Sequence, residues 1–159
     1  MPVEAAEFRR IMGHWTTGVA VVASVAADGA PRGLTANAVA SVALQPTLVL
    51  ACVERCADTH DCIIASQCFS ISILRQADEH TARRFAGDDV ADKFRGLAYH
   101  AEITGAPILD DALAWVDCRV HAVFDGGDHS IVLGEVLAGD AAEAEPLVYY
   151  RSGYHRLAP

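Results

Sequence analysis

The spacing of apolar residues at the start of the chain predicts a helix over residues 4–15. Phe8, Ile11, Met12 and Trp15 recur at intervals of three and four residues, which places them along one side of a helix. Such a stripe is more typical of a packing face than of a functional site. We therefore expect this helix to pack through its apolar side.

Further along the chain, apolar and alternating runs predict strands. A β-branched run over residues 18–27 ends at Asp28-Gly29 and a second arm follows over 32–35, and Asp-Gly between two extended runs is a strong hairpin signal. Other segments show either continuous apolar character or the period of two that is typical of strands. These segments are residues 47–53, 67–74, 113–124, 131–137 and 147–150.

Within 67–74, Phe69, Ile71 and Ile73 are expected on one face and Ser70 and Ser72 on the other. Two short helices are predicted between the strands, over residues 58–66 with Asp58 as N-cap and over 76–86 with Gly87 as terminator. About six strands joined by hairpins, without regular βαβ alternation, indicate a mainly β (α+β) fold. We expect an antiparallel sheet that curls into a barrel with a few short helices.

Length and composition narrow the class of protein. A chain of 159 residues with 52% apolar content fits one domain, here the helix at about 4–15 followed by a barrel at about 16–157. No run reaches the ~18 apolar residues of a membrane span, and the acidic N-terminus lacks the order of a secretion signal, so a cytoplasmic location is expected. A net charge of −9 argues against a nucleic-acid surface.

Several common chemical motifs are missing from the sequence. The five cysteines form no Cys-x-x-Cys pair, so free thiols are expected rather than a disulfide framework or a zinc knuckle. Cys118 and His121 fall on opposite faces of a strand, and no metal site is predicted. Neither a Gly-x-Gly-x-x-Gly turn nor a P-loop offers a backbone cradle for a nucleotide.

Three local groups of residues remain as candidate sites. In Gly33-Leu-Thr-Ala-Asn37, Thr35 and Asn37 lie on one side of an extended backbone and could contact a planar polar ring, although a simple stabilised turn explains them equally well. Residues 55–60 stand at a helix start, where unpaired N–H groups bind phosphate, but an ordinary N-cap is the alternative. His129 lies at the mouth of a hairpin and is either a ligand contact or an exposed side chain without a role.

Taken in order, the segments of this chain resemble the flavin reductase-like domains, the FMN-binding split-barrel proteins that serve two-component flavin-dependent monooxygenases. The resemblance runs from about Phe8 to Tyr154. Its pieces are Thr17-Gly-Val-Ala-Val-Val22, Asp28-Gly29, Gly33-Leu-Thr-Ala-Asn37, Ser41-Val-Ala-Leu-Gln-Pro-Thr-Leu-Val-Leu50, Phe85-Ala-Gly87, Asp92-Lys-Phe94, Gly127-Asp-His129, Gly134-Glu-Val136, Pro146-Leu-Val-Tyr149 and Tyr154.

The resemblance implies a homodimer with flavin, either FMN or FAD, bound near the subunit interface. It also implies that NADH or NADPH passes hydride to the flavin, which then supplies a transient oxygenase partner. The residues that it assigns to flavin are Thr35, Ala36, Asn37 and Ala38 for the ring, Arg55, Cys56 and Thr59 for the phosphate, Lys93 and Phe94 near the flavin, and Ser41 and Tyr154 as further pocket residues. His129 is assigned to the nicotinamide as the catalytic candidate.

One segment departs from the family pattern. Glu54 and Asp58 stand where small hydroxyl or amide residues are common, and two carboxylates beside a doubly ionised phosphate would oppose it. Either these side chains point outward or flavin binds loosely, as suits a reductase that releases its product. Cationic residues near His129 would favour NADPH. Arg and Lys are scarce there, and this favours NADH.

Three other functions share this expected fold. One is a flavin-binding or electron-relay protein without turnover, and another is a split barrel that binds haem or another ligand. The third, a pyridoxal-phosphate oxidase-like enzyme, would need a more basic phosphate pocket than the sequence offers. Because the cofactor carries the redox chemistry, no catalytic triad is required in the reductase.

Overall fold

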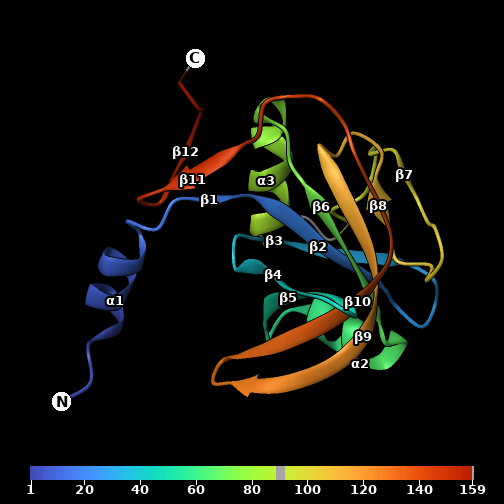
Figure 1. Ribbon diagram of the computed structural model, residues 1–159, viewed down its shortest axis with the longest axis horizontal. Helices are drawn as coiled ribbons and strands as arrows, with labels where there is room; N and C mark the ends of the chain where they lie inside the picture. Colours follow the sequence, from blue (N-terminus) through green and yellow to red (C-terminus); the bar gives the residue numbers. More distant parts are fainter. Residues whose placement is uncertain (89–91, 159) are drawn as a thin grey trace.

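The computed structural model describes residues 1–88 and 92–158. Across these residues the largest sheet has seven strands, all paired antiparallel, in the spatial order β3-β2-β6-β9-β10-β5-β4 (Figure 1). The sheet curls until β3 contacts β5, which confirms the predicted antiparallel barrel. Its strands are β2 (Ala20–Val25), β3 (Pro31–Ala36), β4 (Val39–Leu44), β5 (Thr47–Glu54), β6 (Cys68–Ile73), β9 (Ala114–Gly126) and β10 (His129–Ala141).

The remaining elements are short. The short strands β1 (Thr17–Gly18), β11 (Val148–Tyr150) and β12 (Gly153–His155) form a second sheet, and β7 (Tyr99–His100) pairs with β8 (Ile108–Leu109). The helices are α1 (Ala5–Met12), α2 (Asp58–Ser66) and α3 (Glu79–Ala86), the last preceded by the 3₁₀ turn η1 (Gln76–Asp78). No helix in the described part of the chain is both long and apolar enough to cross a membrane.

Strand β2 separates two hydrophobic cores. Its even-numbered residues, such as Val22, pack inside the barrel against Phe69, while its odd-numbered residues, such as Val21, pack outside against Phe85 of α3. Both faces of β2 are therefore buried, and this explains why the sequence there is continuously apolar instead of alternating.

The serine face of β6 is also buried. Ser70 and Ser72 are almost inaccessible, whereas Ile73 is partly exposed. Ser70 donates a hydrogen bond to the carbonyl of Pro107, and the hydroxyl of Ser72 accepts one from the amide of Leu109 at 3.1 Å. The segment around β8 covers this serine face and satisfies both hydroxyls.

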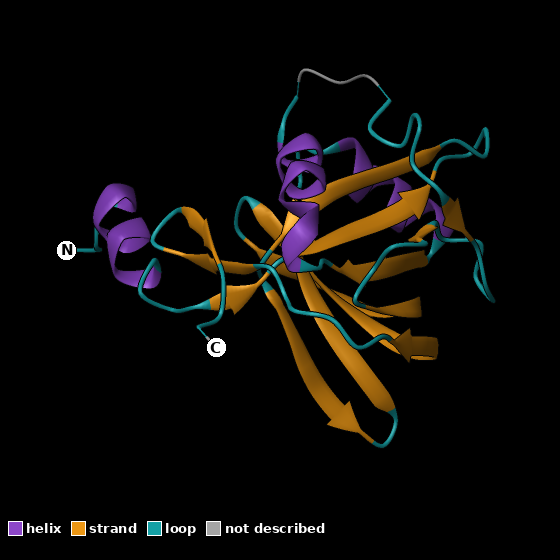
Figure 2. Cartoon of the chain, turned by 90° about the horizontal axis from the view of Figure 1, so that it is seen from above, coloured by secondary structure: helices purple, strands orange, loops and turns teal. Residues whose placement is uncertain are grey.

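Helix α1 is shorter than predicted and does not pack within this chain. It ends at Met12, none of its residues is buried, and the side chains of Phe8 and Trp15 are 57% and 71% exposed. Figures 1 and 2 show the helix standing away from the main sheet. The apolar stripe is present as expected, but among the described residues it is exposed and not packed against the barrel.

Candidate functional site

Strand register brings two turns of the chain together at one end of the barrel. Strand β10 runs antiparallel to β5, and His129, its first residue, lies opposite Glu54, the last residue of β5. The β9–β10 turn therefore sits directly beside the β5–α2 turn. Two of the three candidate segments become neighbours for this reason.

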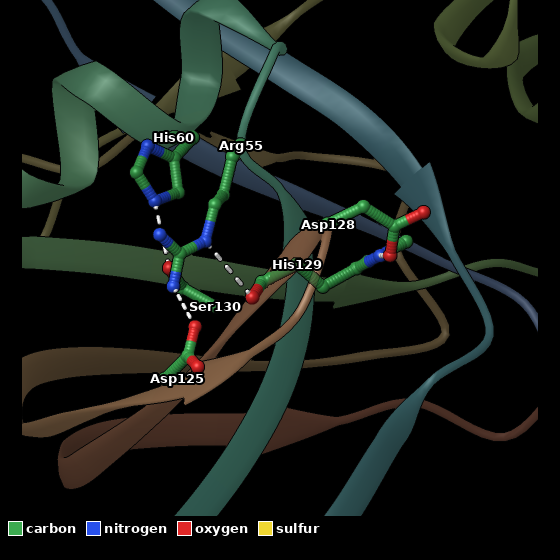
Figure 3. Close-up of polar contacts among 6 residues, drawn as sticks. All are labelled: Arg55, His60, Asp125, Asp128, His129 and Ser130. Carbon is green, nitrogen blue, oxygen red and sulfur yellow. Dashed lines mark hydrogen bonds and ion pairs between the residues drawn. The ribbon is translucent and has the colours of Figure 1, made fainter.

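Arg55 and His60 fasten the β5–α2 region to that hairpin (Figure 3). The amide of Arg55 donates to the carbonyl of Asp128 at 3.0 Å, and its Nε donates to the carbonyl of His129 at 3.2 Å. Its guanidinium also forms an ion pair with Asp125. His60 Nε2 lies 2.9 Å from Ser130 Oγ. The side chain of Arg55 is thus engaged with the hairpin.

Helix α2 begins as predicted at its boundary but is capped differently. Ala57 is the N-cap, with extended backbone angles, and its carbonyl accepts the amide of His60 at 2.9 Å. Asp58 is the first helical residue, which corrects its assignment as N-cap. Within residues 1–88 and 92–158, the amides of Cys56, Asp58 and Thr59 donate to no protein acceptor, so they are available to an anion or water.

Three adjoining cavities line this end of the barrel. The first, named here the α2 cavity, has a volume of about 320 Å³. It is lined by Pro31, Arg32, Gly33, Leu34, Cys56, Ala57, Asp58, Thr59, Asp88, Lys93 and Phe94. The second, the His129 cavity, has about 330 Å³. It is lined by Leu34, Thr35, Ala36, Asn37, Ala38, Cys52, Glu54, Ala57, Phe85, Ala86, Asp88, Lys93 and His129.

The third, the Tyr154 cavity, has about 170 Å³ and is lined by Val19, Thr35, Asn37, Ala86, Tyr149 and Tyr154. Leu34, Ala57, Asp88 and Lys93 line both of the first two cavities, while Thr35, Asn37 and Ala86 line both the second and the third. The three cavities therefore adjoin one another through shared walls, and together they are called the groove below.

Strand β3 and the residues just after it form one wall of the His129 cavity. Thr35 is held in place because its hydroxyl donates to the carbonyl of Ala82 at 2.6 Å, and this leaves the oxygen free to accept a further hydrogen bond. Asn37 follows the end of β3, and Ala36 and Ala38 beside it are small. This wall can therefore offer polar atoms and backbone to a flat molecule at close range.

Gly33 allows β3 to approach the aromatic residues behind it. A Cβ atom at this position would lie 2.9 Å from Cε1 of Phe85 and 3.2 Å from Cε2 of Phe94. The two rings meet edge to face with centroids 4.9 Å apart, and Phe94 is nearly inaccessible. Lys93, beside it, donates from Nζ to the carbonyl of Phe85 at 3.0 Å. Lys93 and Phe94 are thus fixed against α3.

His129 is oriented by its sequence neighbour. Its Nδ1 lies 2.7 Å from Oδ1 of Asp128, and this hydrogen bond holds the pKa of the Asp128 carboxyl below its usual range. With Nδ1 engaged, Nε2 is the ring nitrogen left for a ligand. The side chain is 37% exposed at the edge of its cavity, where a molecule can reach it.

The structure gathers most of the sequence-predicted residues into the groove. Thr35, Ala36, Asn37, Ala38, Lys93 and His129 line the His129 cavity, whereas Cys56, Thr59 and Phe94 line the α2 cavity. Tyr154 lines the third cavity, with Arg83 Cζ 4.9 Å from its ring centroid, and burial raises the pKa of its hydroxyl.

Two predicted residues lie outside the groove. The guanidinium of Arg55 faces the β9–β10 hairpin, and Ser41 is exposed on β4, where it pairs with Val49 of β5. Sequence reasoning missed Arg32, Leu34, Ala57 and Asp88. Arg32 had a usable signal, since it lies one residue before Gly33 on the same predicted arm as Thr35.

Charge in the groove is mixed. Arg32 and Lys93 supply the cations, while the carboxylates of Glu54, Asp58 and Asp88 line the same walls. Glu54 and Asp58, the two acidic departures noted in the sequence, are therefore both among the residues that line the groove. The binding of an anionic ligand here would rely on backbone amides and two cations, and three nearby carboxylates would oppose it.

Comparison with known proteins agrees with this geometry. The sequence model of the flavin reductase like domain matches residues 12–158. The reductase component of a 4-nitrophenol 4-monooxygenase/4-nitrocatechol 2-monooxygenase from Rhodococcus opacus is 39% identical, over 99% of this chain and 84% of that protein. A flavin reductase (NADH) from Kitasatospora aureofaciens is 38% identical, over 97% and 82% of the two chains.

The fold of a solved structure agrees equally well. The NADH:FAD oxidoreductase of Streptomyces globisporus, in complex with NAD and FAD fragments, superposes with a TM-score of 0.91. It is 37% identical and the match covers 98% of this chain and 94% of that one. With the family match over nearly its whole length, the chain belongs to the flavin reductase-like domain family.

Proposed function

We propose that this protein is an NADH-dependent flavin reductase that supplies reduced flavin to a monooxygenase. The observation that carries the proposal is the set of three adjoining cavities, whose walls include the start of α2 with its free amides, the residues of β3, His129 and Tyr154. Relatives at 38–39% identity that are named as a flavin reductase (NADH) and as a monooxygenase reductase component support it.

The residues of the groove fit a flavin. Thr35 and Asn37 can hydrogen-bond the polar edge of a flat ring system, and Ala36 and Ala38 leave room for its face. The unengaged amides of Asp58 and Thr59, together with Arg32 and Lys93, can receive a phosphate in the α2 cavity. Bound flavin supplies the redox chemistry by accepting hydride from the nicotinamide.

The protein's own contribution is alignment. Thr35, fixed by its bond to Ala82, and Lys93, fixed by its bond to Phe85, hold the ring pocket in shape before a ligand arrives. His129, held through Nδ1 by Asp128, presents Nε2 to the nicotinamide amide and orients it for transfer. None of these roles requires a protein nucleophile or a metal.

The proposal includes assembly as a homodimer. In support, α1 presents Phe8, Ile11 and Met12 to solvent, and Trp15 just beyond it is 71% exposed. Exposed apolar groups of this size on one side of a helix are typical of a surface that another chain covers. A second copy is the occupant expected from the resemblance to dimeric split barrels.

The decay of absorbance at 340 nm tests the activity. Purified protein with NADH or NADPH and added riboflavin, FMN or FAD is expected to oxidise NADH faster than NADPH, at a rate that saturates with added flavin. Flavin binding without nicotinamide oxidation would instead leave a storage or relay protein. A Soret band in the purified protein, with no flavin affinity, would replace the proposal with a haem-binding role.

A further inference from the structure

We propose that His60 is a positioning residue, which joins the start of α2 to the strand that carries His129 and makes phosphate binding improve the alignment for hydride transfer. This inference rests on the proposed function and gives a role in the same reaction to a residue that lines none of the three cavities. It follows from the hydrogen bonds that fasten α2 to the barrel.

His60 stands between the two ends of the groove. It follows Thr59, which lines the α2 cavity, and its Nε2 lies 2.9 Å from Oγ of Ser130, the residue after His129 (Figure 3). Its Nδ1 lies 3.1 Å from Oδ1 of Asp61, so both ring nitrogens are engaged. One imidazole therefore connects the proposed phosphate end of the groove to the residue assigned to the nicotinamide.

The contact between His60 and Ser130 is shielded from water. The side chain of His60 is 14% exposed, and Ser130 is 4% exposed. Arg55 also reaches the hairpin, but it precedes the free amides of the turn, and its ion pair with Asp125 is exposed on both sides. Water screens an exposed ion pair, whereas loss of one partner from a shielded hydrogen bond leaves the other partner unsatisfied. The connection through His60 is therefore the tighter of the two.

Binding energy at one end of a ligand can accelerate chemistry at the other end. Contacts to a part of a substrate that does not react raise kcat when they hold the reacting groups in the productive geometry. A phosphate held by the free amides at the start of α2 would restrain the first turn of the helix. Through His60 and Ser130 the same restraint reaches β10 beside His129. Riboflavin, which has no phosphate, cannot use this connection.

The inference predicts different effects on FMN and on riboflavin. In the unaltered protein, kcat for NADH oxidation should be higher with FMN. In His60→Ala, kcat with FMN should fall by about fivefold toward the riboflavin value, as expected for the loss of one shielded hydrogen bond, and kcat with riboflavin should change little. The dissociation constants of both flavins, measured by fluorescence, should stay near those of the unaltered protein, because the phosphate-binding amides remain. A merely structural role would affect both flavins alike.

Three further variants separate positioning from stability. Ser130→Ala removes the same hydrogen bond from the other side and should reproduce the effect of His60→Ala. His60→Gln keeps a side-chain hydrogen-bonding group of similar reach and should restore most of kcat with FMN. Ser66→Ala is the matched control, because Ser66 at the opposite end of α2 lies 2.9 Å, Oγ to Oγ, from Ser24 of β2. It removes another contact of the same helix with the barrel and should leave the ratio of the two kcat values unchanged.

NMR with inorganic phosphate at fixed pH gives a readout without flavin or turnover. Phosphate should shift the amide signals of Thr59 and His129 in the unaltered protein, and that of Thr59 alone in His60→Ala. The inference would be overturned by equal FMN-to-riboflavin kcat ratios in the unaltered protein and His60→Ala, or by a His129 shift that persists in His60→Ala. If no flavin supports NADH oxidation by the unaltered protein, it is the proposed function that fails.

Discussion

At the residue scale, the orientation of His129 depends on polar contacts with its neighbours and not on packing in the core. Its ring is held at Nδ1 by Asp128, and its backbone carbonyl accepts a hydrogen bond from Arg55. Both contacts are polar and lie at the protein surface, so the surrounding core does not determine the orientation of the imidazole. Single substitutions can therefore test its role without disturbing the fold.

His129→Ala is expected to lower kcat for NADH oxidation by about tenfold and to change the flavin dissociation constant little, because alignment of the nicotinamide is lost. Asp128→Asn should cause a smaller decrease, since the ring remains. Stopped-flow reduction separates the two quantities. An unchanged kcat in His129→Ala would remove this residue from the mechanism.

Acid should weaken the same orientation. The pKa of Asp128 is lowered in the folded protein by its bond to His129, so the carboxylate stays charged below the usual range and the contact is lost only as the pH falls through that lowered value. The ratio of kcat in the unaltered protein to kcat in Asp128→Asn should therefore stay constant across neutral pH, because Asp128 remains charged there.

Two arginines near the β5–α2 turn are expected to behave differently. Arg32 lines the α2 cavity, so Arg32→Ala should raise the dissociation constants of FMN and FAD by about fivefold and spare riboflavin, which has no phosphate. Arg55 contacts Asp125 and the carbonyl of His129, so Arg55→Ala should affect all three flavins to a similar extent. If Arg55→Ala weakened the binding of FMN and FAD but not of riboflavin, Arg55 would contact the flavin phosphate directly, as the sequence alone suggested.

At the scale of elements, local patterns predicted most of the architecture. Helix 58–66 and the strand ends near residues 47, 74 and 150 lie at or within two residues of their expected positions, because charge placement and alternation act locally. Strand β4 was not predicted, since Val39–Leu44 is mostly exposed and its pairing with β5 contains a register shift. The cover over Ser70 and Ser72 depends on a segment more than thirty residues away.

The groove was predictable in part for the same reason. Thr35 and Asn37 share a side of an extended backbone by sequence spacing alone, and both line the His129 cavity. The orientation of Arg55 depends instead on the β5–β10 register, which places Asp125 and the carbonyl of His129 within its reach. A long flexible side chain next to several possible partners cannot be assigned from its neighbours in sequence.

The β9–β10 hairpin crosses the barrel at a point where no side chain fits. A Cβ atom on Gly134 would overlap the ring of Phe69 and lie 2.9 Å from Cβ of Cys118. Gly134→Ala is expected to lower the free energy of unfolding by about 1–3 kcal/mol through overpacking. Thermal or urea unfolding measures this, with Gly18→Ala as the control because nothing lies within 4 Å of a Cβ there. Equal midpoints for the two variants would contradict the prediction.

For the whole molecule, the exposed stripe on α1 makes a test of assembly possible. Phe8→Glu is expected to shift the protein from dimer toward monomer, because it places a charge where apolar contact is proposed. Arg9→Glu alters a neighbouring exposed position outside the stripe and should leave the oligomeric state unchanged. Size-exclusion chromatography with light scattering distinguishes the species, and a monomeric unaltered protein would exclude the dimer.

The strand shared by the two cores has a consequence for how the molecule comes apart. Alternate residues of β2 belong to the core inside the barrel and to the core under α3. Neither core can therefore unfold while the other keeps β2 in place. Strand β3, with Thr35, is the edge of the sheet and is bonded along β2 alone, so it loses its pairing whenever β2 opens. The two cores should therefore unfold in one cooperative transition, and the amides of the central strand β2 should exchange with solvent only through complete opening.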